Sequence, residues 1–424
     1  MERLHTLLKR LLHWSQKHTK TDMRYMVGGA LWLTGEQGVV ALVALGLAVA
    51  FAHLIPPDDY GHYRFILSIF WALTAVSLTG LSTALSRAVA KGAEGSYRLA
   101  VRLSLLGGIP VAVAGLLISG YYALQGNALL SSGVLVIALL GPFFQAAVLF
   151  GPLIVGKQDF KRAALSGICL SVFPALLMLA AMFLTDNPVI FIGLYLAGTI
   201  ITGIVLSIRT YRAYQLNRTV DPEMRKHSIH FSIMNVLSVL SQQADKITVF
   251  HYVGALELAL YAFAVALPDQ IKGFSSNIAT LAFPKFAERA SSALRDNLWG
   301  RVWLLTGALA LIAFAYILVA PFVFDILFAP YRDAVIYSQV LALVIVFGAN
   351  EVLLTVLQAK AATRELYIFN IVSPLFAMGT LVVLTIFFGL WGAVIARLLS
   401  RAGNALLLTI LVSIVLRRPE PSVS

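Results

Sequence analysis

The segment VWLLTGALALIAFAYILVAPFV, residues 302–323, contains no charged side chain. At about 1.5 Å per residue, a helix of this length crosses a hydrocarbon core roughly 30 Å thick. Similar apolar blocks recur along the chain, separated by short charged segments. They predict about twelve membrane spans, at about 27–52, 62–85, 101–123, 129–151, 164–184, 188–208, 229–252, 258–283, 302–323, 335–357, 367–388 and 390–416.

The composition agrees with this prediction. Hydrophobic residues make up 59% of the chain and charged residues 12%, whereas soluble domains have roughly 45–50% apolar and about 25% charged residues. Lipid offers the backbone no hydrogen bonds, and the blocks lack the period-two alternation of transmembrane barrel strands. The sequence therefore predicts an all-α integral membrane protein with about 12 transmembrane helices.

The distribution of positive charge predicts the orientation. All but six of the 32 Lys and Arg residues lie in the amino-terminal tail, in alternate loops or in the carboxyl tail. The positive-inside rule places these segments, and therefore both termini, in the cytoplasm. This topology explains the net charge of +12, which in a soluble protein would suggest nucleic acid, so no nucleic-acid partner is expected.

The amino-terminal tail carries six Lys and Arg residues in 26 positions and no small-residue cleavage site. It is predicted to be retained and not to act as a cleaved signal peptide. Leucines at helical spacing in ERLHTLLKRLLHW, residues 2–14, leave two interpretations open. The tail is either an amphipathic helix at the membrane interface or a basic segment that only sets topology.

The longest connection, residues 209–227, divides the predicted spans into two groups of six. Weak self-similarity at an offset of 198 residues favours two parallel repeats; it pairs His53, Tyr63, Phe65, Arg87 and Lys91 with His251, Tyr261, Phe263, Lys285 and Arg289. The predicted organisation is a cytoplasmic tail (1–26), an N-terminal six-helix lobe (27–208), a cytoplasmic linker (209–227), a C-terminal six-helix lobe (228–418) and a short cytoplasmic tail (419–424).

Ionisable residues inside the predicted spans are the main candidates for function. A charge at the bilayer centre costs at least about 2.5–3.5 kcal/mol, so such residues face a partner, water or the interior of a bundle. The predicted substrate-binding cations are Lys246, Lys272, Arg397 and Arg401, and the candidates for ion coupling or helix pairing are Glu36, Asp245, Asp269 and Glu351.

Spacing sharpens the role of two of these residues. Arg397 and Arg401 are four apart and share one helix face, which Asn404 continues. Two aligned guanidinium groups suit an anionic ligand. In the second half, four interior cations face three interior acids, so complete pairing leaves one cation free. For Asp245 and Asp269, pairing with Lys246 and Lys272 that only neutralises charge or locks helices together remains an alternative to a functional role. For Glu36 and Glu351, a helix-locking hydrogen bond and a coupling-ion site both remain open.

Several chemistries lack a motif. The sequence has no Walker-type phosphate loop, no dinucleotide fingerprint and no HExxH motif, and its single cysteine, Cys169, provides no metal cluster. The predictions are therefore that the chain is not an enzyme, has no catalytic residues, and holds no metal or cofactor beyond a coupling H⁺ or Na⁺.

Four segments are similar to the signature segments of one known family. LIPPDDYGHYRF (54–65) is similar to the proline, acidic and Tyr-Gly-x-Tyr signature after the first span. LSQQADKITVFHYVGALELALYAFA (240–264) resembles the glutamine, Asp-Arg/Lys, Gly and Tyr pattern of span seven. GPLIVGKQDFKRAALSG (151–167) and FDILFAPYRDAVIYSQVLAL (324–343) resemble two further segments, although Ala329-Pro330 replaces a glycine in the second.

These segments resemble the polysaccharide biosynthesis and O-antigen flippases of the multidrug/oligosaccharidyl-lipid/polysaccharide (MOP) exporter superfamily. The resemblance implies two six-helix lobes around a cationic central cavity in a bacterial inner membrane. It implies alternating access for an undecaprenyl-pyrophosphate-linked oligosaccharide, proton or sodium coupling, and contact with membrane lipids and other polysaccharide assembly proteins. By motif, only Asp245 and Lys246 carry over. A multidrug or cation exporter of the same fold and an integral-membrane polysaccharide polymerase or ligase remain alternatives, although a net-basic interior repels cationic drugs and the outer loops are short.

Overall fold

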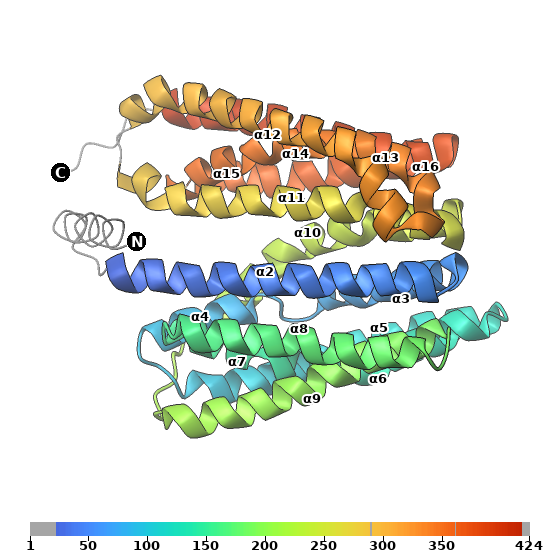
Figure 1. Ribbon diagram of the computed structural model, residues 1–424. Helices are drawn as coiled ribbons and strands as arrows, with labels where there is room; N and C mark the ends of the chain where they lie inside the picture. The colour runs from blue at the N-terminus through green and yellow to red at the C-terminus, as the bar shows by residue number, and fades with distance from the viewer. Residues whose placement is uncertain (1–22, 289–290, 361, 418–424) are drawn as a thin grey trace, which may run out of the picture.

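The computed structural model describes residues 23–288, 291–360 and 362–417, so most of the predicted amino-terminal tail and all of residues 419–424 lie outside the described residues. Within these ranges the chain forms helices and short connections, with no strand (Figure 1). The first half contains α2 (Met23–Leu54), α3 (Pro57–Leu73), η1 (Thr74–Val76), α4 (Leu81–Ala90), α5 (Ser96–Leu124), α6 (Ala128–Val148), α7 (Phe150–Gly156), α8 (Phe160–Met182) and α9 (Pro188–Tyr214). The second half contains α10 (Met224–Tyr252), α11 (Ala255–Glu288), α12 (Ser291–Leu327), η2 (Ala329–Ala334), α13 (Val335–Leu341), α14 (Leu343–Val346), η3 (Phe347–Ala349), α15 (Asn350–Ala359) and α16 (Thr363–Arg417).

The described helices account for twelve spans. Eight are long and apolar enough to cross a membrane, and a ninth candidate is the pair α3–α4, which bends by 56°. One of the eight, α16, is a hairpin and supplies two spans. The remaining two are α10 and α11, which are long but carry more polar residues. The predicted all-α membrane fold is confirmed.

The turn inside α16 occurs at Gly389, which has a φ of 56° and a ψ of −135°. Only glycine adopts this region without strain. The Thr380 and Ser400 hydroxyl oxygens lie 3.4 Å apart, whereas a continuous helix would separate them by about 30 Å. The two arms are therefore antiparallel, and the break falls between the predicted spans 367–388 and 390–416.

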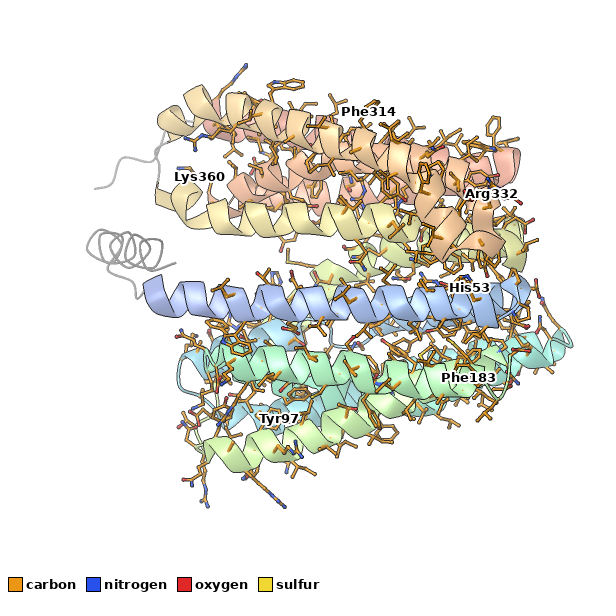
Figure 2. All side chains as sticks on the ribbon, viewed as in Figure 1. His53, Tyr97, Phe183, Phe314, Arg332 and Lys360 are labelled. Atoms are coloured by element: carbon orange, nitrogen blue, oxygen red, sulfur yellow. The ribbon has the colours of Figure 1, made fainter. Side chains whose placement is uncertain are left out.

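The connections alternate between two ends of the bundle. One end, called the linker end, carries the segment between α9 and α10. Figure 2 shows Tyr97 and Lys360 at this end and His53, Phe183 and Arg332 at the other, called the distal end. The loops predicted to be cytoplasmic from their Lys and Arg content thus gather at one end of the bundle.

The two halves of the chain form two layers in Figure 1, with α10 between them. The offset of 198 residues recurs in the helix bounds, since α2 ends at Leu54 and α10 at Tyr252, and α3 begins at Pro57 and α11 at Ala255. The helices α9 and α10 extend into both ends of the predicted linker and leave only residues 215–223 between them.

The second helices of the two halves, α3 and α11, pack against each other near the distal end. A Cβ on Gly61 would overlap the carbonyl oxygen of Ala255, so only glycine permits this approach. Buried aromatic rings from both halves surround the contact and are called here the aromatic cluster: Phe51, Tyr60, Tyr63 and Phe191 from the first half, and Phe263, Phe328 and Tyr331 from the second. The rings of Tyr60 and Phe263 join the halves at 4.8 Å between centroids. The distal end is therefore closed.

At the linker end, the segment between α9 and α10 is bonded to the first half. The Asn217 side chain donates to the carbonyl oxygen of Gly92 at 2.7 Å and accepts from the N–H groups of Glu94 and Gly95 at 3.2 and 3.3 Å. Glu94 accepts from the Asn217 N–H at 3.1 Å and from the Lys157 ammonium. This set of contacts is called the linker clamp.

The Lys157 hydrogen bond lowers the pKa of the Glu94 carboxyl, and the Asn217 N–H adds to this effect. Because the pKa of Glu94 is lowered in the folded state, its contribution to stability is fully present at pH values above the ordinary Glu pKa. This stabilisation is lost as the pH falls through the lowered pKa. The Glu94 carboxylate of the linker clamp is therefore ionised at neutral pH.

The first part of α10 also packs on the first half. The Gly80 N–H donates to the Ser232 hydroxyl at 2.9 Å, and a Cβ on Gly80 would overlap the backbone of Ser228 and Ser232. The later part of α10 packs on α16. The helix α10 therefore links the two layers along its length.

Candidate functional site

A cavity of about 730 Å³ lies beside α10, on the linker-end side of the aromatic cluster. The lining residues that the structure describes all come from α10, α11, α15 and α16, that is, from the second half. They are Ser238, Ser241, Gln242, Gln243, Asp245, Lys246, Asp269, Lys272, Glu351, Leu354, Phe369, Ser373, Pro374, Ala377, Leu381, Ala396, Arg397, Ser400, Arg401 and Asn404. The cavity brings together every ionisable candidate that the sequence places in the spans of the second half.

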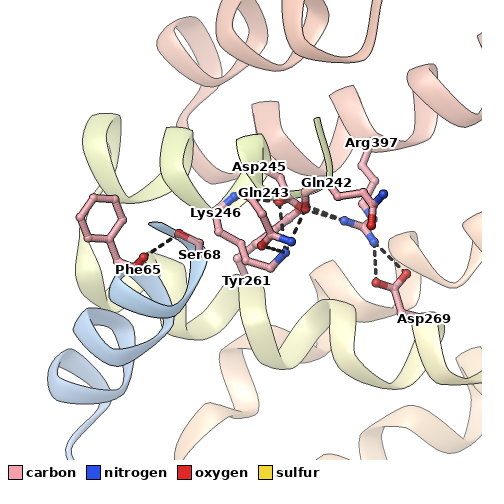
Figure 3. Close-up of polar contacts among 9 residues, drawn as sticks. All are labelled: Phe65, Ser68, Gln242, Gln243, Asp245, Lys246, Tyr261, Asp269 and Arg397. Atoms are coloured by element: carbon pink, nitrogen blue, oxygen red, sulfur yellow. Dashed lines mark hydrogen bonds and ion pairs between the residues drawn. The ribbon is translucent and has the colours of Figure 1, made fainter. Parts of the chain in front are cut away.

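Arg397 is the centre of the ionic network (Figure 3). Its Nη2 donates to both carboxylate oxygens of Asp269, at 2.7 and 2.6 Å, and its Nη1 donates to Oδ2 of Asp245 at 2.6 Å. Charge-assisted bonds of this length are roughly twice as strong as neutral ones. The Arg397 guanidinium is thus held by two carboxylates from α10 and α11.

Tyr261 supports this arrangement from the closed side. Its hydroxyl donates to Oδ2 of Asp245 at 3.0 Å, and the side chain is fully buried. Lys246 lies on the other side of Asp245, with its ammonium 3.4 Å from Oδ1 and 3.3 Å from Oε1 of Gln243. Asp245 therefore accepts from a tyrosine, an arginine and a lysine, which together compensate its burial.

Lys272 and Glu351 form a second, looser pair, with 3.7 Å between Nζ and Oε1. Arg401 differs from the other cations of the cavity. Among the residues that the structure describes, none forms a hydrogen bond or an ion pair with its guanidinium. Arg401 therefore presents its donors to the cavity itself.

The sequence predicted one cation in excess, and the geometry assigns the excess charge to Arg401. Arg397 and Arg401 share a helix face but differ in their surroundings. The carboxylates of Asp245 and Asp269 accept hydrogen bonds from Arg397. Of the two arginines predicted to bind an anion, Arg397 is paired with carboxylates, whereas Arg401 has no such partner within the described part of the chain.

One candidate lies elsewhere. Glu36 is on α2 and packs against α8, where a Cβ on Gly167 would overlap its carboxylate. Glu36 is absent from the residues that line the cavity. Of its two predicted roles, this position suits helix pairing.

Sequence reasoning assigned no role to Tyr261 or to the glutamines of α10. Tyr261 lies in the segment 240–264 that resembles the family's Gly and Tyr pattern, and it pairs with Tyr63 at the repeat offset. Its hydrogen bond to Asp245 spans sixteen positions and two helices, so no local spacing reveals it. The glutamines precede Asp245 in QQADK, where the available signals were the glutamine of the family pattern and a polar run inside a span.

Comparisons with known proteins give the family context. Residues 26–290 match the family model described as polysaccharide biosynthesis protein, and a search of curated proteins finds no match. The chain is similar to the inward-facing structure of a multidrug resistance MATE family transporter of the MOP superfamily, at 16% identity and a TM-score of 0.68, covering 90% of this chain and 96% of that one. An outward-facing structure of a transporter so described gives 14% identity and a TM-score of 0.62, with 92% and 95% covered.

The chain is also similar to the lipid II flippase MurJ in an inward closed conformation. The identity is 12% and the TM-score 0.62, with 90% of this chain and 87% of that one covered. At such identities the likeness establishes a shared fold, and function has to be argued from the site.

Proposed function

Because the chain belongs to the polysaccharide biosynthesis protein family, we propose that it is a flippase for a lipid-linked oligosaccharide with an anionic headgroup. The fold is that of transporters and flippases of the MOP superfamily. The observation that carries the proposal is the Arg401 guanidinium, which lines a cavity of about 730 Å³ and has no hydrogen-bond or ion-pair partner among the described residues. An undecaprenyl pyrophosphate supplies the charge and the bidentate acceptors that such a group binds.

The composition of the cavity supports a sugar-bearing substrate over a cationic drug. Four cations face three carboxylates, and serine, glutamine and asparagine side chains provide further donors and acceptors. A cationic ligand would meet the excess positive charge, whereas hydroxyl-rich sugars match the neutral polar groups. The alternative of a multidrug exporter is therefore less well supported by this lining.

The closed distal end and the cavity beside it support an alternating-access cycle. The aromatic cluster separates the cavity from the distal end, and the TM-score is higher for the inward-facing transporter than for the outward-facing one. Together with the positive-inside rule, these observations favour a linker end in the cytoplasm of a bacterial inner membrane.

This orientation gives a first prediction. In a Cys169→Ser background, single cysteines at positions 58 and 186 are expected to react with an impermeant maleimide added to intact spheroplasts. Cysteines at 92, 159 and 220 should react only after permeabilisation. The reverse pattern would place the linker end outside and contradict the proposed direction of transport.

Reconstitution tests the function itself. Proteoliposomes holding the purified protein are expected to translocate an undecaprenyl-pyrophosphate-linked oligosaccharide at least about tenfold faster than protein-free vesicles, measured by the saccharide that becomes accessible to an impermeant glycosidase. Uptake of a cationic dye serves as the competing arm. Dye transport without saccharide translocation would favour the multidrug exporter.

We further propose that an H⁺ or Na⁺ gradient drives turnover, with Asp269 or Glu351 as the group that exchanges the ion. Asp269 is the more exposed carboxylate on Arg397, with 43% of its side chain accessible against 11% for Asp245. Glu351 has a single ion pair among the described residues, the contact of 3.7 Å to Lys272. In the same vesicles, imposing each gradient separately identifies the ion, and rates equal to the gradient-free rate in both cases would remove coupling.

A further inference from the structure

Tyr331 carries a buried hydroxyl that the proposed function leaves without a role. Tyr331 lies in η2 and is fully buried, at 0% exposure. Within the described part of the chain, its hydroxyl has no hydrogen-bond partner. Buried hydroxyls are normally paired, because an unpaired one loses its bonds to water without replacement.

This hydroxyl sits inside the contact that closes the distal end. The Tyr331 ring lies 4.1 Å from that of Phe263 on α11 and 6.3 Å from that of Tyr60 on α3, between centroids. Tyr60 belongs to the first half, whereas Phe263 and Tyr331 belong to the second. Separation of the two halves at this point would open the aromatic cluster and expose the hydroxyl to water.

The Tyr331 hydroxyl would therefore gain hydrogen bonds to water when the distal end opens and lose them when it closes. Apolar contacts favour the closed state: Phe65 and Phe250 stack at 3.7 Å across the halves, and Phe263 packs on Tyr60 at 4.8 Å. The desolvated hydroxyl opposes them, because only the open state gives it hydrogen bonds. A cluster made wholly of hydrocarbon would close more tightly.

The aromatic cluster that closes the distal end is called here the distal gate. We propose that Tyr331 shifts the conformational equilibrium of this gate: its buried hydroxyl destabilises the closed state, so that the gate opens at a useful rate. The inference rests on the proposed alternating-access function, but it concerns an equilibrium that needs no substrate. It can therefore fail while the proposed substrate stands, and it can hold if the substrate is different.

The test uses the full-length protein with Cys169→Ser and a reporter cysteine from Ala259→Cys, a residue buried on α11 beside the gate. Adding Tyr331→Phe is expected to lower the rate of maleimide labelling of the reporter about tenfold in purified protein. This corresponds to about 1.4 kcal/mol in favour of the closed state. The melting midpoint of the variant should rise.

The matched control is Tyr316→Phe, which removes a buried hydroxyl that is bonded to Ser338 at 2.6 Å. This variant is expected to leave the labelling rate unchanged and to lower the melting midpoint. Unchanged or faster labelling in Tyr331→Phe would overturn the proposal, as would a fall in its melting midpoint equal to that of the control.

Discussion

Arg401→Ala is expected to reduce export of the lipid-linked saccharide roughly 10- to 100-fold while the protein accumulates to a near-normal level. Hydrogen bonds to charged groups contribute about 1.5–3 kcal/mol, and every 1.4 kcal/mol corresponds to about a factor of ten. Because Arg401 has no described partner, its removal leaves no carboxylate unpaired. The measurement is the translocation rate in proteoliposomes at equal amounts of reconstituted protein.

Arg401→Lys should fall between the wild type and Arg401→Ala. Lysine keeps the charge but lacks the planar fork that binds two oxygens of one phosphate. The matched control is Arg332→Ala, which removes an arginine paired with Asp325 on the exposed distal surface and should transport normally. Normal transport by Arg401→Ala would remove the main support for an anionic headgroup in this cavity.

Arg397→Met is expected to destabilise the protein itself, by about 3–5 kcal/mol, as breaking a buried ion pair does. The substitution leaves Asp245, a nearly buried acid, without its shortest contact and strips Asp269 of both bonds to the guanidinium. The expected readouts are a lower melting midpoint and a lower yield of folded protein. Substitution of Arg401 would thus impair transport, whereas substitution of Arg397 would impair folding stability.

Neutralising the acids provides the decisive comparison. Arg397→Met combined with Asp245→Asn and Asp269→Asn should regain part of the lost stability, because the two carboxylates that lose the guanidinium are then neutral, while Lys246 loses Asp245 as its partner. Arg332→Met, which breaks an exposed pair, should change stability by about 1 kcal/mol or less. If Arg397→Met alone melts like the wild type, the network is not structural, and Arg397 would be a second headgroup ligand.

The fold followed from hydropathy because the membrane restricts the options so strongly. The uncharged block 302–323 could only be a span, and the break at Gly389 falls where two apolar blocks meet. The more polar helix α10 was counted as a span from its block 229–252, and the distribution of Lys and Arg independently supported an even number of spans. Charge distribution thus agreed with the span count that the apolar blocks predicted.

The site was only half accessible from the sequence. Helical spacing placed Arg397 and Arg401 on one face, and counting charges left one cation over. Identifying that cation as Arg401 required the register of α10 and α11 against α16, which brings Asp245 and Asp269 to Arg397. Side-chain periodicity contains no such information, because it reports which face is buried and not which residue of another helix it meets.

The linker clamp constrains where the molecule can flex. Asn217 and Glu94 fasten the connecting segment to the first half, and Ser232 ties the start of α10 to Gly80. The connecting segment, residues 215–223, is therefore not a flexible linker between the two halves but is fixed to the first half. In the proposed alternating-access cycle, the bend is therefore expected further along α10, between Ser232 and the Asp245 network, so that the later part of this helix would carry the charged cavity with it relative to the first half.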